Sequence, residues 1–289
     1  MAPKKKILKK KKPIRTLSFG LIFLFAIFVI VIGVFATNPA LFGKASLTSI
    51  KAGAAKTKEC KFVPRQHLYA PILMYHHIGY SKYRNAYYVT PEIFDQQMKW
   101  LRENNYNVIP MKQFHEAISC GWDLPENPTV LTFDDGDLDQ YDNAVSILEK
   151  YGFDGTFYIV TRWLGDKYHM TWDMVKNLSN AGFTIGGHTR LHPNVAHLGE
   201  NSLKIELLDS KTEIEGETGK TVEFFAYPGG AHSKNAENHV RDYGYLNAVT
   251  TEHRVYHDIN KEDDFYTLGR IHIGDEMSSF IDLMHGVGL

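Results

Sequence analysis

The stretch VLTFDDGDLDQYDNA, residues 130–144, passes from strand-forming into helix-forming residues. Two carboxylates, Asp134 and Asp135, stand side by side where the apolar run ends. A simple turn would explain them, because Asp-Asp-Gly suits turns and aspartate caps helices. A binding site would explain them as well, because α/β folds place their ligands at the carboxyl ends of strands. The rest of the chain has to decide between these two interpretations.

Strand-like and helix-like segments alternate from residue 71 to the end of the chain. Thr90 and Pro91 mark the start of one expected helix, and Gly152 and Gly182 mark the ends of two others. Strands are expected over residues 71–77, 106–110, 128–133, 155–160, 183–188, 222–228, 245–250 and 266–273. Repeated units of this length predict an α/β fold with a mainly parallel sheet, as a closed or nearly closed (β/α) barrel of about seven or eight units. An open doubly wound sheet is the alternative, but no G-x-G-x-x-G follows the first strand, so we expect no dinucleotide site.

The first 36 residues differ from the remainder. Eight basic residues and no acidic residue lie between positions 4 and 15, and residues 17–36 carry no charge. About 20 apolar residues are enough to cross a bilayer. We therefore predict a basic cytoplasmic tail over 1–16 and a transmembrane signal anchor over 17–36, with the remainder outside the cytoplasmic membrane. The alternative is a signal peptide cleaved after Ala36, which would release the domain as a secreted protein.

A small, polar segment over residues 37–68 is expected to link this anchor to one domain over residues 69–289. Cys60 and Cys120 could pair outside the cell, although Cys60 falls in the expected linker. Beyond residue 36 the chain holds 24 basic and 33 acidic residues, a net charge of −9. Such a charge does not favour polyanions, so we expect no nucleic-acid partner.

Four polar segments follow predicted strands, and a barrel would bring them to one rim: MYHH at 74–77, TFDDG at 132–136, GGHTRLHP at 186–193 and FAYPGG at 225–230. His188 and His192 are four residues apart, a spacing that lets two imidazoles reach one ion. With one carboxylate of the aspartate pair they form a set that is common around catalytic zinc. The other carboxylate would then take a proton from water that the ion activates.

These residues resemble the polysaccharide deacetylase family, carbohydrate esterase family four. Residues 132–136 match its T-F-D-D-G motif, and residues 188–192 match its H-[ST]-x-x-H motif, in the same order. The resemblance runs from about residue 71 to the end. It implies a distorted (β/α) barrel and the hydrolysis of acetyl groups on N-acetylated sugars, or sometimes of O-acetyl groups on other polymers. It also implies a divalent metal, for which zinc is the expected ion.

The resemblance assigns roles to individual residues. Asp134 is the catalytic base, and the metal ligands are Asp135, His188 and His192. The third motif implies that Tyr227 and Gly229 bind substrate, with the Gly229 backbone N–H holding the oxyanion.

The sequence departs from the family pattern in two places. Ala226 stands where the third motif has an arginine that steadies the base, and Arg270 is the expected replacement. The family's late L-x-H motif matches only the letters LMH at 283–285, in a helix-like tail.

The opening PILMYHHIG resembles a subgroup, which includes exported poly-N-acetylglucosamine deacetylases, where the L-x-H element comes first. In that arrangement His76 is the general acid. Strand alternation places His77 on the opposite face, so we expect no catalytic role for His77. His285 lies in a helix-like tail with no strand to aim it, so we expect none for His285 either.

The sequence thus predicts a membrane-anchored, metal-dependent deacetylase of a polysaccharide of N-acetylglucosamine outside the cytoplasmic membrane. Peptidoglycan, chitin-like chains and O-acetyl esters are alternative substrates, and a catalytically silent carbohydrate-binding protein is an alternative of another class. A glycosidase fits less well, because its two carboxylates stand about 5 Å or more apart across the sugar.

Overall fold

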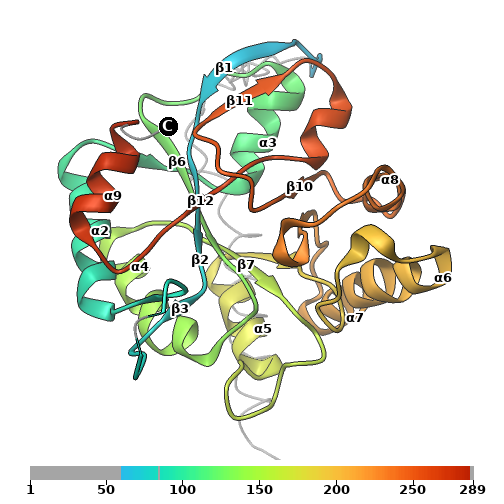
Figure 1. Cartoon of the computed structure of the whole chain (residues 1–289), viewed down its shortest axis with the longest axis horizontal. Coiled ribbons are helices and arrows are strands. Elements are labelled where there is room, and N and C mark those ends of the chain that lie inside the picture. The colour runs from blue at the N-terminus through green and yellow to red at the C-terminus, as the bar shows by residue number, and fades with distance from the viewer. Residues whose placement is uncertain (1–59, 84, 287–289) are drawn as a thin grey trace, which may run out of the picture. The chain divides into compact units, whose positions relative to one another are not determined.

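The computed structural model describes residues 60–83 and 85–286, and these contain an eight-stranded parallel sheet (Figure 1). The main strand order is β10-β9-β8-β7-β6-β2-β12, with β5 paired to β6. The strands are β2 (Ile72–Tyr75), β5 (Asn107–Val108), β6 (Pro128–Phe133), β7 (Thr156–Ile159), β8 (Thr184–Gly187), β9 (Phe224–Ala226), β10 (Asn247–Val249) and β12 (Ile271–His272). Each of them falls within a strand expected from the sequence.

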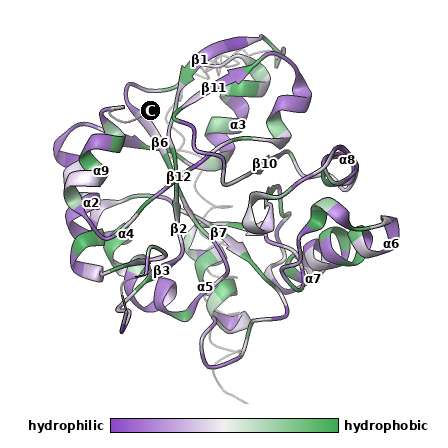
Figure 2. Cartoon of the chain, viewed as in Figure 1, coloured by the Kyte–Doolittle hydropathy of each residue, from purple (hydrophilic) through white to green (hydrophobic). Residues whose placement is uncertain are grey.

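Helices connect these strands and surround the sheet (Figure 1). They are α2 (Pro91–Glu103), α3 (Met111–Cys120), η2 (Gln140–Ala144) running into α4 (Val145–Tyr151), α5 (Trp172–Ala181), α6 (Glu200–Leu203), η4 (Lys204–Asp209), α7 (Ser210–Thr218), α8 (Lys234–Asp242) and α9 (Met277–Met284). The predicted ends are confirmed: Gly152 and Gly182 follow α4 and α5 in the left-handed region, which only glycine enters without strain. Several helices contain both hydrophilic and hydrophobic residues, coloured purple and green in Figure 2. This is expected of helices that pack one face on a core.

The sheet is curled, with helices on its outside, and it agrees with the expected distorted (β/α) barrel. From β2 through β6, β7, β8 and β9 to β10 the strands lie side by side in chain order. A doubly wound sheet would reverse this progression part-way, so that alternative is wrong. The last strand, β12, lies beside β2, while Leu268, just before β12, forms a parallel bridge to Val249 of β10. The two ends of the strand order are therefore drawn together.

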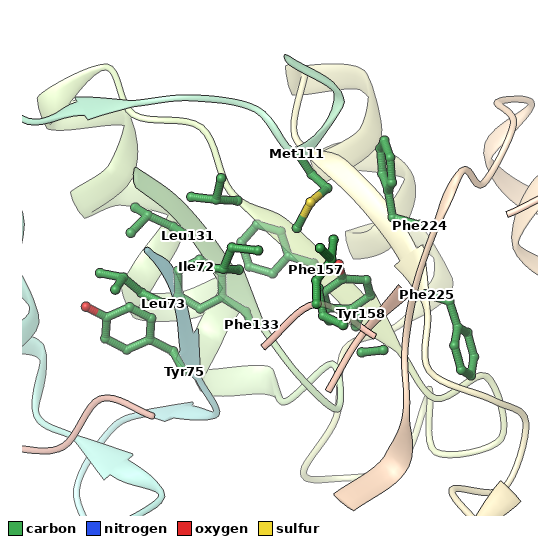
Figure 3. Close-up of a cluster of buried hydrophobic side chains, with 14 of the residues drawn as sticks. Ile72, Leu73, Tyr75, Met111, Leu131, Phe133, Phe157, Tyr158, Phe224 and Phe225 are labelled. Atoms are coloured by element: carbon green, nitrogen blue, oxygen red, sulfur yellow. The ribbon is translucent and has the colours of Figure 1, made fainter. Parts of the chain in front are cut away.

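An aromatic stack fills the centre of the sheet. Phe133 of β6 lies between Tyr75 of β2, at 5.4 Å between ring centroids, and Phe157 of β7, at 4.7 Å (Figure 3). All three rings are fully buried. Truncating such a ring to alanine typically costs about 3–5 kcal/mol. This core holds β2, β6 and β7 in register, and thereby fixes where the polar residues after β2 and β6 emerge.

The domain begins before residue 69. Residues 65–68, which we expected in the linker, belong to strand β1 (Arg65–Tyr69), which pairs antiparallel with β11 (Tyr256–Ile259). A disulfide joins Cys60 to Cys120 at the end of α3. The strands β1 and β11 form a separate two-stranded sheet. This sheet joins residues 65–69 to residues 256–259 of the same domain.

The predicted tail and anchor, residues 1–36, and most of the linker lie outside the described residues. Within residues 60–83 and 85–286, no helix is both long and apolar enough to cross a membrane.

Candidate active site

A cavity of about 590 Å³ opens at the carboxyl ends of the strands. The four predicted segments all reach it, and β12 adds a fifth. Its lining includes His76 after β2, Asp134 and Asp135 after β6, His188 and His192 after β8, Gly229 after β9, and His272 at the end of β12. The sequence therefore identified the correct rim of the sheet.

Asp135, His188 and His192 form one group, here called the His–Asp triad. Asp135 Oδ1 lies 3.4 Å from His188 Nε2 and 3.5 Å from His192 Nε2. One atom of each residue lies within 4.8 Å of the others. Ligand atoms about 2.0–2.2 Å from a shared tetrahedral ion stand about 3.3–3.6 Å apart, so these separations fit a zinc site.

The surroundings of the triad prepare it for a cation. His188 Nδ1 donates a hydrogen bond to the carbonyl of Ala226 at 2.7 Å, which leaves the Nε2 lone pair turned toward Asp135. Asp135 Oδ1 is buried and accepts no hydrogen bond from the described residues. Burial alone would lower the pKa of His188, but the carboxylates of Asp135 and Asp134 raise it, so this position attracts positive charge.

Three of the six described non-glycine residues with a positive φ lie in or beside the triad. Asp135 has a φ of 77° and His192 a φ of 60°, both in the left-handed region that favours glycine. Thr189, between the two histidines, has a φ of 66°, and its hydroxyl accepts a hydrogen bond from the His192 N–H. Such conformations cost about 1–3 kcal/mol each and persist at functional sites, where the surrounding structure holds them.

The neighbouring carboxylate, Asp134, has a different environment. Its two oxygens accept hydrogen bonds from the guanidinium of Arg270 at 2.7 and 2.6 Å. Arg270 is fully buried and also donates to Thr132 and to the carbonyl of Thr250. The prediction that Arg270 replaces the arginine absent at position 226 is confirmed. The two carboxylates have separate partners, because Asp134 pairs with Arg270 while Asp135 faces the two histidines, and their roles as base and metal ligand stay a prediction.

Arg270 keeps Asp134 ionised. Burial alone would raise the pKa of this carboxyl group, but Arg270 and, secondly, His188 hold the pKa well below its usual range. A bidentate arginine–carboxylate pair also fixes the plane of the carboxylate. Arg270 thus keeps Asp134 ionised and in a fixed orientation.

His76 lines the same cavity as the triad. Gln140, at the start of the π-helical turn η2, donates to the carbonyls of both His76 and Asp134, at 2.8 and 2.5 Å. This side chain ties the expected acid to the expected base. Burial lowers the pKa of His76, and its Nδ1 finds no hydrogen-bond partner in the part of the chain that the structure describes.

The third motif contributes one cavity residue. Gly229 lines the cavity and has a φ of 60°. The Tyr227 side chain is fully buried and packs against Phe225 and His232. Tyr227 is not among the described residues that line the cavity, so the structure gives no support to the expected substrate contact of this side chain. His285 packs against Trp100 after α9, as expected for a residue with no catalytic role.

A model of the polysaccharide deacetylase family matches residues 122–248, the region that carries the aspartate pair and both histidines of the triad. The chain therefore carries a polysaccharide deacetylase domain, and the relatives and solved structures that it resembles are polysaccharide deacetylases. The deacetylase is therefore a hydrolase of the class that acts on carbon–nitrogen bonds other than peptide bonds. His76, Arg270 and His272 lie outside the matched region.

Relatives support this assignment. The deacetylase is 29% identical over 208 residues to the "Putative polysaccharide deacetylase YxkH" of Bacillus subtilis, a match that covers 72% of each chain. It is 26% identical over 172 residues to the poly-beta-1,6-N-acetyl-D-glucosamine N-deacetylase of Staphylococcus epidermidis, which covers 58% of this chain and 57% of that protein. Among solved structures it is similar to the Streptococcus pyogenes deacetylase PplD in complex with acetate, with a TM-score of 0.70 and 26% identity over 78% of this chain and all of that one.

Sequence reasoning missed His272, a cavity residue of the deacetylase. The His272 ring lies 5.9 Å from that of His76, and the Tyr87 ring meets both of them edge-on. His272 Nε2 is buried without a hydrogen-bond partner among the described residues. The signal was its position two residues after Arg270, because alternate residues of a strand face the same side.

Sequence reasoning also misplaced His77. This residue, expected on the opposite face from His76, lines the same cavity and lies against Asp137 and Asp139 in the loop after β6. His77, Asp137 and Asp139 are here called the neighbouring cluster. The spacing of acids in DDGDLD was the available signal, but a turn explains it equally well.

Proposed function

We propose that the deacetylase removes N-acetyl groups from a polymer of N-acetylglucosamine in a metal-dependent reaction outside the cytoplasmic membrane. One observation carries the proposal. A triad fit for a divalent ion, a base held by Arg270 and an imidazole all face one cavity. Hydrolysis of an amide needs these three elements together.

The metal would be held by Asp135, His188 and His192. A zinc-class ion bound there would act as a Lewis acid and would make water nucleophilic near neutral pH. Asp134 accepts the proton of the attacking water, since it is ionised and fixed beside the triad. The backbone N–H of Gly229 donates to the developing oxyanion, a role that needs no particular side chain.

His76 gives a proton to the leaving amine. An unprotonated amine is a poor leaving group, so the tetrahedral intermediate would otherwise return to substrate. His76 faces the cavity beside Asp134, to which Gln140 connects it. An O-acetyl ester has a less demanding leaving group, so a strong dependence on His76 favours an amide substrate.

A second cavity, of about 650 Å³, favours a polymeric substrate. It shares Asn85 and Ala86 with the catalytic cavity and is lined by the exposed tyrosines Tyr80 and Tyr83. Tyrosine rings provide large, rigid faces at low cost in conformational entropy, which suits contact with the apolar faces of sugar rings. Sugar units beyond the one in the catalytic cavity would bind there.

The location rests on the sequence alone. The basic residues before the apolar segment 17–36 support an anchored domain on the outer side of the membrane. The name of the S. epidermidis relative supports poly-N-acetylglucosamine as the polymer.

Acetate release from defined polymers, with and without a chelator, tests the function. We expect release from poly-N-acetylglucosamine, its loss with chelator, and its return with Zn²⁺. Asp134→Asn should keep the metal and lose turnover, whereas Asp135→Asn should weaken metal binding. Equal metal loss in both variants would contradict these roles, and release only from peptidoglycan, chitin or O-acetylated chains would identify the alternative substrate. A protein that binds these polymers without releasing acetate would be a silent carbohydrate-binding protein.

A further inference from the structure

The neighbouring cluster resembles the triad in its donor atoms. His77 Nδ1 lies 3.1 Å from Asp139 Oδ2 and 3.2 Å from Asp137 Oδ2. One ligand atom of each residue lies within 4.8 Å of the others. His169 adds a second imidazole, with its Nε2 3.5 Å from Asp137 Oδ1.

The described residues supply too few hydrogen-bond donors for the carboxylates of this cluster. His77 Nδ1 carries at most one proton, and its hydrogen bond goes to Asp139. Asp139 is further satisfied by the Ile78 N–H, at 3.3 Å. Asp137 Oδ2 points at the same ring nitrogen, yet it accepts no hydrogen bond within residues 60–83 and 85–286.

Burial makes this arrangement costly. Asp137 is only 3% exposed. A buried carboxylate oxygen without a donor loses its hydration and receives nothing in return. A divalent ion in the place of the His77 proton would bind one atom from each of His77, Asp137 and Asp139, and would satisfy all three residues together.

The distances fit such an ion. Two ligand atoms about 2.1 Å from one ion stand about 3.0 Å apart in octahedral and about 3.4 Å apart in tetrahedral geometry. The observed separations of 3.1 and 3.2 Å fall between these values. An imidazole with two carboxylates suits Zn²⁺ or Mn²⁺ better than Ca²⁺, which prefers oxygen ligands alone.

We propose that His77, Asp137 and Asp139 bind a second divalent transition-metal ion, with Zn²⁺ as the reference ion. The ion joins β3 (His77–Ile78) to the loop after β6 that carries Asp134 and Asp135. It acts by positioning this loop and does not contact the reacting atoms. The site does not depend on which acetylated substrate the deacetylase hydrolyses.

Metal stoichiometry tests the proposal. The full chain, purified in detergent, is stripped with chelator, loaded with Zn²⁺, dialysed and assayed for zinc per chain by atomic emission. We expect two ions in the wild type, one in Asp137→Asn and one in Asp135→Asn. The variant with both substitutions should bind none. Asp142→Asn is the matched control, because Asp142 is an exposed aspartate of η2, which directly follows this loop. This variant should keep two bound ions.

The outcomes separate the two metal sites. One ion in the wild type and one in Asp137→Asn, with none in Asp135→Asn, would overturn the second site and leave the triad intact. Two ions in Asp137→Asn would overturn it equally. His77→Gln, which keeps the carboxylates, provides a second variant if Asp137→Asn does not give the circular dichroism spectrum of the folded protein.

Discussion

The triad and the neighbouring cluster have similar side chains but different surroundings. Both combine imidazole with carboxylate, and both lie beside the loop after β6. The triad takes its ligands from the ends of β6 and β8, and the carbonyl of Ala226 on β9 orients one of its rings. The neighbouring cluster takes His77 from β3 and both of its aspartates from a single loop.

The surroundings decide what each group can do. Beside the triad stands Asp134, which Arg270 keeps ionised, and His76 faces the same cavity. Beside the neighbouring cluster the acids repel one another. Burial, together with Asp135 and Asp139, raises the pKa of Asp137 to about 7 against the opposing effect of His77. A donor set therefore identifies a candidate metal site, and under the proposed function the base and the acid beside the triad are what make it reactive.

The largest effect should come from removing one ligand from each group. His188→Ala should lose the ion of the triad and all measurable acetate release, because the remaining two ligands cannot hold an ion at this position. His77→Gln should retain acetate release within about tenfold, because it disturbs only the position of the loop. Acetate assays and zinc content measured on the same preparations check this contrast. Equal loss of activity in both variants would mean that the two groups form one catalytic centre.

His76 should show the next largest effect. His76 and His77 are neighbours in sequence and both line the cavity, but His77 pairs with Asp137 and Asp139, so we assign the proton transfer to His76. His76→Ala should retain the metal and lower turnover about 10²–10⁴-fold. The alkaline limb of the pH profile should change with it, because that limb reports loss of the proton from the imidazole. A greater loss of turnover in His285→Ala would contradict this and would restore the family's ordinary motif order.

Arg270 distinguishes the environment of Asp134 from that of Asp137. Arg270→Met should leave a buried carboxylate unpaired and destabilise the fold by about 3–5 kcal/mol. The pKa of Asp134 should rise, because the charge that lowers it is removed. Asp134 would then become protonated at a higher pH, so the acid limb of activity should move upward. Denaturant unfolding and a pH–rate profile check both effects, and an unmoved acid limb would mean that Asp134 is not the base.

The smallest effect should come from the tyrosine cavity, which lies outside both groups. Tyr83→Ala removes a ring that is 74% exposed, so the fold should be unaffected. The KM for long chains should rise a few-fold, in keeping with about 0.5–1.5 kcal/mol for one aromatic contact. The KM for short oligomers should not change. Tyr256→Ala, an equally simple change of an exposed tyrosine on β11, is the control.

The sequence by itself determined the order of strands and helices and the rim on which the site lies. Local signals carry this information, because a buried parallel strand reads as an apolar run and glycine ends a helix at a residue that can be named. Asp134, Asp135, His188 and His192 were identifiable for the same reason, since each falls within a short motif directly after a strand.

Tertiary structure alone decided which distant residues meet. Arg270 reaches Asp134, 136 positions earlier, because β12 lies beside β2 and β2 lies beside β6. His272 joins His76 through the same pairing. We expected no catalytic role for His77, because strand alternation places it on the face opposite to His76. Strand alternation does not predict which loop approaches a residue, and here the loop after β6 brings Asp137 and Asp139 to His77. Long-range strand order depends on the packing of the whole sheet, and no short segment of the chain encodes it.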